Sequence, residues 1–214
     1  MSFICFDNVS KDFGRNKILN SVSFSVEKGE ICGFVGRNGS GKTVIFKLMA
    51  GLMKPDSGEI KINGRNYPEK GYFFNSTGVM IETPDFIPHY SGLKNLKILN
   101  SLSEKAVSVD EIRSLMKRLG LDDKNRNSVS AYSLGMRQKL GIIQAVMNKP
   151  ELLILDEPMN SLDTESAKEV RELLKELNAT GTTIVIASHI SDDIDMLCTK
   201  IFSVENKTVK RKSI

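Results

Sequence analysis

Apolar and polar residues alternate along the amino-terminal part of the chain, as they do in β-strands with one face in water. The alternation runs from Phe3 to Phe6 and again from Val22 to Val26, which predicts two antiparallel strands. Residues 11–17 between them are polar apart from Phe13 and predict a loop. This part of the chain is therefore expected to form an antiparallel β subdomain.

Short segments rich in aliphatic and β-branched residues predict further strands. They lie at 30–35, 59–62, 78–81, 151–155, 183–186, 201–204 and 208–209. Two other segments carry apolar residues at helical spacing: Val44, Ile45, Leu48, Met49 and Leu52, and then Ala167, Val170, Leu174 and Leu177. Strands that alternate with helices in this way predict a parallel sheet with right-handed crossovers.

Helical spacing dominates from about Ser91 to Met147. The apolar positions that define it are Leu93, Leu96, Leu99, Ile112, Leu115, Met116, Leu119, Leu140, Ile143 and Met147. We therefore predict an α/β fold in which an α-helical subdomain, 84–149, is inserted into a core formed by residues 1–83 and 150–214. A length of 214 residues fits one domain, 1–214, with a substantial core.

A glycine-rich loop joins the strand at 30–35 to the helix that follows it. Glycines allow successive N–H groups to point inward, and the helix start presents its positive dipole end, so such a loop suits phosphate. Lys42 would neutralise the β- and γ-phosphates, and the Thr43 hydroxyl would ligate Mg²⁺. The predicted nucleotide-binding residues are Gly36, Asn38, Gly39, Ser40, Gly41, Lys42 and Thr43. The order strand, loop, helix favours a nucleoside triphosphate site over the alternative, a glycine-rich turn with a solvated lysine.

Two adjacent carboxylates follow the apolar run at 152–155. Ligands of open α/β sheets bind beyond the carboxyl ends of strands, so Asp156 and Glu157 are expected to face the phosphate loop. Asp156 would hold Mg²⁺ through its water shell, as the second acidic element of phosphate-loop ATPases does. Pro158 would end the strand and turn Glu157 toward the nucleotide, where a carboxylate can orient and polarise the attacking water. The alternative is a strand that ends in two solvated acids.

The composition narrows the class of protein. Hydrophobic residues make up 40% of the chain and charged residues 26%, which excludes a disordered protein. No apolar stretch approaches the length of a bilayer span and the start lacks a signal-peptide pattern, so we expect the chain in the cytoplasm. The basic residues behind the net charge of +4 are scattered along the chain, so the charge alone indicates no partner. Cys5, Cys32 and Cys198 are widely separated and predict buried free thiols.

The segment 132–140 resembles the signature sequence of the nucleotide-binding domains of ABC transporters, and the resemblance extends over essentially the whole chain. Where that family has Leu-Ser-Gly-Gly-Gln, this chain keeps Ser133 and Gly135 and departs at Tyr132, Leu134 and Met136. Ser133 can cap the helix that follows and, with the Gly135 backbone, gives that helix an anion-binding start. The alternative is a capped surface helix that contacts no partner. The implied fold is a P-loop NTPase core with the two subdomains predicted above.

The resemblance implies a set of roles for single residues. Ser133 and Gly135 would bind the γ-phosphate of ATP held by a second ATPase domain, so that two copies dock head to tail around two ATP molecules. Phe13 would stack on adenine instead of serving as a loop anchor packed on the core. Asp163, in the loop 160–163, would lie at the dimer interface, and His189 would contact the γ-phosphate and support hydrolysis.

Glu82 stands where most members of that family have a glutamine that reaches toward Mg²⁺ and the attacking water. A glutamate can still ligate the metal but adds a negative charge. This residue, the segment 82–86 and the Tyr-Ser-Leu-Gly-Met signature resemble the ATPases of bacterial exporters that handle peptide antibiotics and lantibiotics.

The implied function is that of an ATP-hydrolysing motor subunit, peripheral on the cytoplasmic face of the membrane. It would use ATP and Mg²⁺ and drive a separate integral membrane permease, docked near residues 82–91, for export of a peptide antibiotic or similar substrate. The alternative is a soluble ABC-type ATPase that acts on nucleic acid or the ribosome. The chain lacks the coiled-coil insertion, second ATPase domain or large basic surface typical of that class, so no nucleic-acid partner is predicted. A small-molecule phosphoryl transferase would leave Ser133, Gly135 and His189 unexplained.

Overall fold

The computed structural model describes residues 2–67, 76–189 and 191–212. The strands in these ranges are β1 (Ser2–Phe13), β2 (Asn16–Glu27), β3 (Ile31–Val35), β4 (Ser57–Ile62), β5 (Arg65–Asn66), β6 (Thr77–Met80), β7 (Leu152–Asp156), β8 (Thr183–Ala187), β9 (Lys200–Glu205) and β10 (Thr208–Lys212). The helices are α1 (Lys42–Met49), α2 (Gly92–Ser101), α3 (Val109–Arg118), the short 3₁₀ helix η1 (Val129–Ala131), α4 (Leu134–Val146), α5 (Thr164–Ala179) and α6 (Ser191–Leu197). Each strand predicted from the sequence overlaps an observed one.

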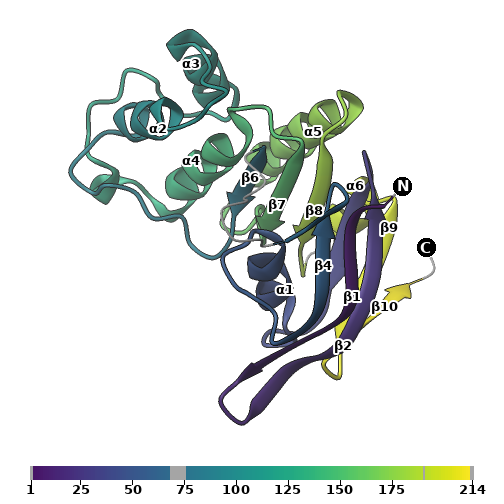
Figure 1. Cartoon of the computed structure of the whole chain (residues 1–214). Helices are drawn as coiled ribbons and strands as arrows, with labels where there is room; N and C mark the ends of the chain where they lie inside the picture. The colour runs from purple at the N-terminus through teal and green to yellow at the C-terminus, as the bar shows by residue number, and fades with distance from the viewer. Residues whose placement is uncertain (1, 68–75, 190, 213–214) are drawn as a thin grey trace.

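The larger sheet is mostly parallel. Its order over the described residues is β10-β9-β3-β8-β7-β6, with only β10 antiparallel to its neighbour. Helices connect its strands, and α2, α3 and α4 gather beside the β6 edge (Figure 1). The smaller sheet, β2-β1-β4-β5, is antiparallel. The predicted α/β fold class, with its antiparallel β subdomain, is confirmed.

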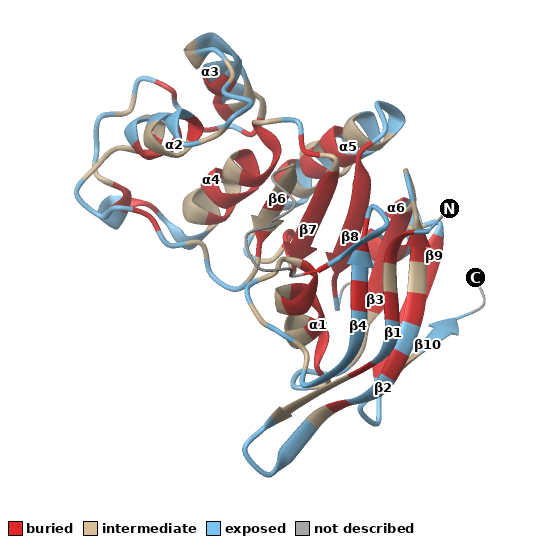
Figure 2. Cartoon of the chain, viewed as in Figure 1, coloured by how far each residue is buried: buried red, intermediate tan, exposed pale blue. Residues whose placement is uncertain are grey.

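The central strands of the larger sheet, β3, β7 and β8, are buried on both faces because their residues alternate between two apolar clusters (Figure 2). Leu153 and Leu155 face the cluster that includes residues of α3 to α6, whereas Leu152 and Ile154 face the cluster shared with α1 and the smaller sheet. Helix α1 contributes Phe46 to this second cluster, where its ring meets that of Phe34 edge to face, with 5.6 Å between centroids. The helix that follows the glycine-rich loop is thus fixed between two sheets.

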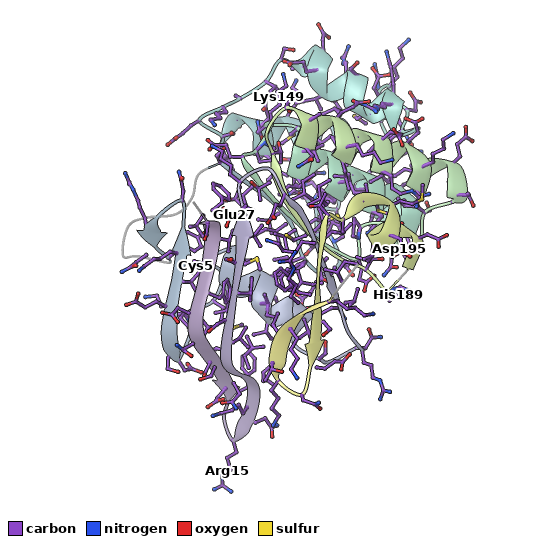
Figure 3. All side chains as sticks on the ribbon, turned by 90° about the vertical axis from the view of Figure 1, so that its right-hand side faces the viewer. Cys5, Arg15, Glu27, Lys149, His189 and Asp195 are labelled. Atoms are coloured by element: carbon purple, nitrogen blue, oxygen red, sulfur yellow. The ribbon has the colours of Figure 1, made fainter. Side chains whose placement is uncertain are left out.

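The predicted loop at 11–17 is wrong. Strands β1 and β2 continue through this segment, with Phe13 opposite Asn16, and only Gly14 and Arg15 form the turn. Figure 3 shows Arg15 at the tip of this hairpin, pointing away from the body of the protein. Asp56 holds β1 there, since its carboxylate accepts from Lys11 Nζ at 2.8 Å and from the Asp12 N–H at 2.7 Å. Residues 13–17 are exposed, so this end of the ribbon has no buried face and its sequence carries no apolar alternation.

Two smaller expectations also need correction. Helix α1 ends at Met49, and Leu52 is 67% exposed instead of lying on the helix face. The chain turns at Gly51, where φ is +70° and an added Cβ would lie 2.6 Å from the Tyr67 hydroxyl oxygen. Of the three free thiols, Cys32 is buried, but Cys5 and Cys198 are only partly so.

Candidate functional site

Four neighbouring strands of the larger sheet end at one place. The glycine-rich loop follows β3, Glu82 lies just beyond β6, Asp156 ends β7, and His189 follows β8. These are carboxyl ends of parallel strands, the edge at which open α/β sheets bind ligands. A cavity of about 680 Å³ opens there. The predicted site residues among those that line it are Phe13, Asn38, Gly39, Gly41, Lys42, Thr43, Glu82, Asp156 and Glu157.

The glycine-rich loop curls around the Lys42 side chain. Lys42 is 6% exposed, and its Nζ donates to the carbonyl oxygens of Gly36 and Arg37 at 2.8 and 3.3 Å. Ser40 Oγ is buried and has no hydrogen-bond partner among the described residues. Gly36 cannot be replaced without distortion, because an added Cβ would lie 2.5 Å from the carbonyl oxygen of Val204. The Lys42 ammonium group lines the cavity and would donate to a phosphate oxygen there.

Helix α1 begins directly after the loop. Its N-cap, Gly41, has φ +108°, and within the described part of the chain no side chain caps the helix start. The first N–H groups of a helix then remain available to an anion, and the helix dipole favours negative charge at the same place. The loop and helix start fit a phosphate group.

Thr43 and Asp156 meet although 113 residues separate them in sequence. Thr43 Oγ1 donates to Asp156 Oδ2 at 2.7 Å, which joins the first turn of α1 to the end of β7. Burial raises the pKa of Asp156, opposed by the hydrogen bond from Thr43. A hydroxyl and a carboxylate are oxygen ligands of the kind Mg²⁺ prefers. The described residues contain no group of three or more His, Cys, Asp or Glu side chains suited to a metal, so phosphate and water oxygens would have to complete its coordination.

The chain leaves β7 at Glu157, where the backbone conformation changes. The φ of Glu157 is +52°, its N–H donates to the Ala187 carbonyl at 2.9 Å, and Gln138 Nε2 donates to the carbonyl oxygens of Glu157 and Pro158, both at 3.0 Å. The turn therefore begins one residue before Pro158, to which the sequence assigned it. Gln138 was missed at the sequence level because it reaches this turn from a different helix, α4.

The Glu157 carboxylate lies against His189. Its Oε2 accepts the His189 N–H at 3.2 Å and lies 2.7 Å from His189 Nδ1. His189 itself is 59% exposed in its side chain, and it borders a neighbouring hollow together with Gly36 and Ser188. The structure thus brings a candidate base and a histidine together at the edge of the cavity.

Glu82 forms an ion pair that the sequence did not predict. Lys47 Nζ lies 2.7 Å from Glu82 Oε1, and Lys47 is one turn beyond Thr43 on α1. The sequence indicates that Lys47 lies on the same face of the helix as Thr43, since residues four apart on a helix share a face. It does not indicate that Glu82 is the partner of Lys47, because Glu82 approaches from the end of β6.

Ser133 and Gly135 lie at the start of α4, where Ser133 is the N-cap residue. Ser133 Oγ accepts the Met136 N–H at 3.2 Å and so caps the helix, as predicted from its residue type. Neither residue lines the cavity, although Leu134 between them does. An added Cβ at Gly135 would lie 2.7 Å from the Ser161 carbonyl oxygen, so only glycine fits there without displacement.

The loop 160–163 and the hairpin tip border the same cavity. Asn160 and Ser161 line it, and Asp163 caps α5 by accepting the Ser166 N–H at 2.8 Å. Phe13 also lines it from the hairpin and is 48% exposed. An aromatic ring that open to water is not anchored in a core, so it offers a face for stacking.

A buried ion pair supports the turn that carries His189. Asp193 is 0% exposed; its Oδ1 accepts from Arg171 Nη1 at 2.7 Å and its Oδ2 accepts from Ser188 Oγ at 3.0 Å. We expect Asp193→Ala to lower the free energy of unfolding by about 3 kcal/mol, because it leaves a charged guanidinium without its partner. Urea unfolding measures this, with Asp192→Ala as the exposed neighbouring control. Equal urea midpoints for the two variants would show that the pair contributes nothing.

Comparisons with known proteins agree on one family. Residues 19–160 match the family described as ABC transporter. BcrA of Enterococcus faecalis, named a bacitracin transport ATP-binding protein, is 40% identical over 193 residues, which are 89% of this chain and 62% of BcrA. SrtF of Streptococcus pyogenes, named a lantibiotic transport ATP-binding protein, is 35% identical over 96% of this chain and 88% of its own length. The chain thus spans less than two thirds of BcrA but most of SrtF.

Solved structures show the same fold. One titled as the ATP-binding subunit of an ABC transporter has a TM-score of 0.90 and 25% identity, covering 100% of this chain and 90% of its own. Another, titled as a dimeric post-hydrolysis state of the ATP-binding cassette MJ0796 bound to ADP and Pi, has a TM-score of 0.88 at 23% identity, covering 98% of each chain. Within the residues that the structure describes, no helix is both long and apolar enough to span a membrane.

Proposed function

The chain belongs to the ABC transporter family of ATP-binding proteins, and from that premise we propose that it is the ATP-hydrolysing motor subunit of a transporter. Membership confirms the resemblance drawn from the sequence. The observation that carries the proposal is the meeting of the glycine-rich loop, the Thr43–Asp156 hydrogen bond and the Glu157–His189 contact around one cavity.

ATP is the proposed substrate of this cavity. Residues 36–43 would hold its phosphates through backbone N–H groups and the Lys42 ammonium group. Phe13, at the hairpin tip, would stack on the adenine ring. The uncapped start of α1 and the presence of Lys42 in the cavity lining support this placement.

Thr43 and Asp156 would hold Mg²⁺, with Glu82 within reach of the same metal. The metal, when bound, supplies positive charge that stabilises the phosphoryl group during transfer. Glu157 would orient the attacking water and accept its proton. His189, 2.7 Å from the Glu157 carboxylate through Nδ1, would hold that carboxylate in place and contact the γ-phosphate.

Two copies would complete each ATP site. Ser133 and Gly135 do not line the cavity of their own chain, but they form a capped, glycine-containing helix start suited to an anion. We infer that they cover ATP held by the partner, so that two identical chains dock head to tail. In this arrangement Asp163 and its loop lie at the dimer interface.

The permease would be a separate membrane protein. We infer that residues 84–149 form a helical subdomain within a single ATPase domain, 1–214, and that the permease docks near 82–91 on the cytoplasmic face of the membrane. The names of BcrA and SrtF support a peptide antibiotic or similar molecule as the exported substrate. The proposal includes no nucleic acid.

Copurification from native membranes tests the motor role. A tagged chain extracted in mild detergent is expected to retain an integral membrane protein at about equal molar amounts, because a motor must be coupled mechanically to its permease. Mass spectrometry of the retained protein, with a tag-only preparation as control, gives the answer. Retention of ribosomes or nucleic acid in place of a membrane protein would contradict the proposal and favour the soluble ABC-type ATPase.

A further inference from the structure

Lys47 is the cation that faces Glu82. Its Nζ lies 2.7 Å from Glu82 Oε1, and the two side chains are 28% and 62% exposed. Lys47 lies four residues after Thr43 on α1, so the ammonium group projects from the face of the helix that carries the Thr43 hydroxyl. The ion pair therefore lies beside Thr43 and Asp156, the residues proposed to hold the metal.

Three carboxylates, those of Glu82, Asp156 and Glu157, line this cavity. Their charges interact, since burial first and then the charges of Glu157 and Glu82 raise the pKa of Asp156. Lys42, the lysine that lines the cavity, is turned into the glycine-rich loop, where its Nζ donates to two carbonyl oxygens. Lys47 is thus the cation that pairs directly with the carboxylate of Glu82.

The backbone of Glu82 is also unusual. Its φ of +62° lies in the left-handed region, which non-glycine residues adopt infrequently. Such a conformation persists where the surroundings determine it. The ion pair with α1 is an interaction that fixes the Glu82 side chain in this turn.

We propose that Lys47 is a positioning residue that holds Glu82 against α1 and so sets the affinity of the site for Mg²⁺. With the pair formed, Glu82 is held on the helix and its charge is offset. With the pair broken, the carboxylate is free to turn toward Thr43 and Asp156 and bind the metal directly. The inference rests on the proposed function, because it concerns the metal that accompanies ATP in this cavity.

A double-mutant cycle tests the proposal by binding alone, without reference to hydrolysis. The variants are Lys47→Gln, Glu82→Gln and the double variant, and the probe is a fluorescent ATP analogue titrated at increasing free Mg²⁺. Lys47→Gln is expected to lower the half-saturating Mg²⁺ concentration about tenfold, through loss of a nearby positive charge and release of a carboxylate ligand. In the Glu82→Gln background the same change is expected to have an effect of about threefold or less, since no carboxylate is released.

Two controls make the result specific. Lys47→Arg keeps the charge and is expected to behave like the parent protein. Lys61→Gln breaks an ion pair of the smaller sheet, Lys61 with Glu59 at 3.4 Å, and is expected to leave the Mg²⁺ dependence unchanged. Should Lys47→Gln fail to fold, Glu82→Gln alone carries the test, because removal of the carboxylate is expected to raise the half-saturating Mg²⁺ concentration about threefold.

An unchanged Mg²⁺ dependence in Lys47→Gln, or an equal shift in both backgrounds, would overturn the role of Lys47. If Lys47→Gln does not fold, an unchanged value in Glu82→Gln overturns it equally. These outcomes differ from failure of the proposed function, which would show as absence of Mg²⁺-dependent binding in the parent protein.

Discussion

Glu157→Gln is expected to reduce ATP turnover about 10²- to 10⁴-fold while ATP still binds. The amide keeps the size of the side chain but cannot accept the proton of the attacking water. Since hydrolysis would open the dimer, the variant should accumulate as an ATP-bound dimer. Steady-state hydrolysis and light scattering with and without Mg-ATP measure the two effects.

Glu205→Gln is the control for this prediction, because Glu205 is an exposed glutamate at the end of β9. It is expected to hydrolyse ATP at the parent rate. Normal turnover in Glu157→Gln would remove Glu157 as the base, and loss of ATP binding would show that the carboxylate is needed for the nucleotide itself.

Ser133→Phe is expected to abolish ATP-dependent dimerisation while a single chain still binds ATP. The phenyl ring would occupy the place at the start of α4 where the partner's γ-phosphate is proposed to lie. Loss of the cap to Met136 would also cost about 1 kcal/mol of stability. Nucleotide binding to dilute protein and light scattering of the same variant in a Glu157→Gln background separate the two effects.

Ser108→Phe is the matched control. Ser108 caps α3 by accepting the Glu111 N–H at 3.2 Å. Its replacement removes a comparable N-cap in the same helical region, outside the proposed interface. We expect Ser108→Phe to lose similar stability and to dimerise normally. Equal dimerisation of the two variants would mean that the α4 start does not cover a nucleotide.

Local sequence patterns predicted the fold well where burial imposes them. The central strands of the larger sheet are apolar on both faces, as at 152–155, and the glycine-rich loop is defined by its own residues. The hairpin from Phe13 to Asn16 was missed because both of its faces meet water, and the position of Leu52 because α1 ends earlier than its apolar spacing suggests.

Direct contacts between distant segments could not be predicted from local sequence patterns. The sequence placed Thr43 and Asp156 at the same Mg²⁺, but not their direct hydrogen bond, which arises because β3 and β7 end at one edge of the sheet. The Lys47–Glu82 ion pair joins a helix to a turn 35 residues away.

The central claim is that ATP held by one copy is covered by the α4 start of another. Its most direct test is the structure of the Glu157→Gln variant saturated with Mg-ATP. We expect two copies that enclose two ATP molecules, with each Ser133 hydroxyl hydrogen-bonded to the γ-phosphate held by residues 36–43 of the other copy. Separate monomers with ATP bound, or a dimer whose Ser133 residues face water, would contradict it.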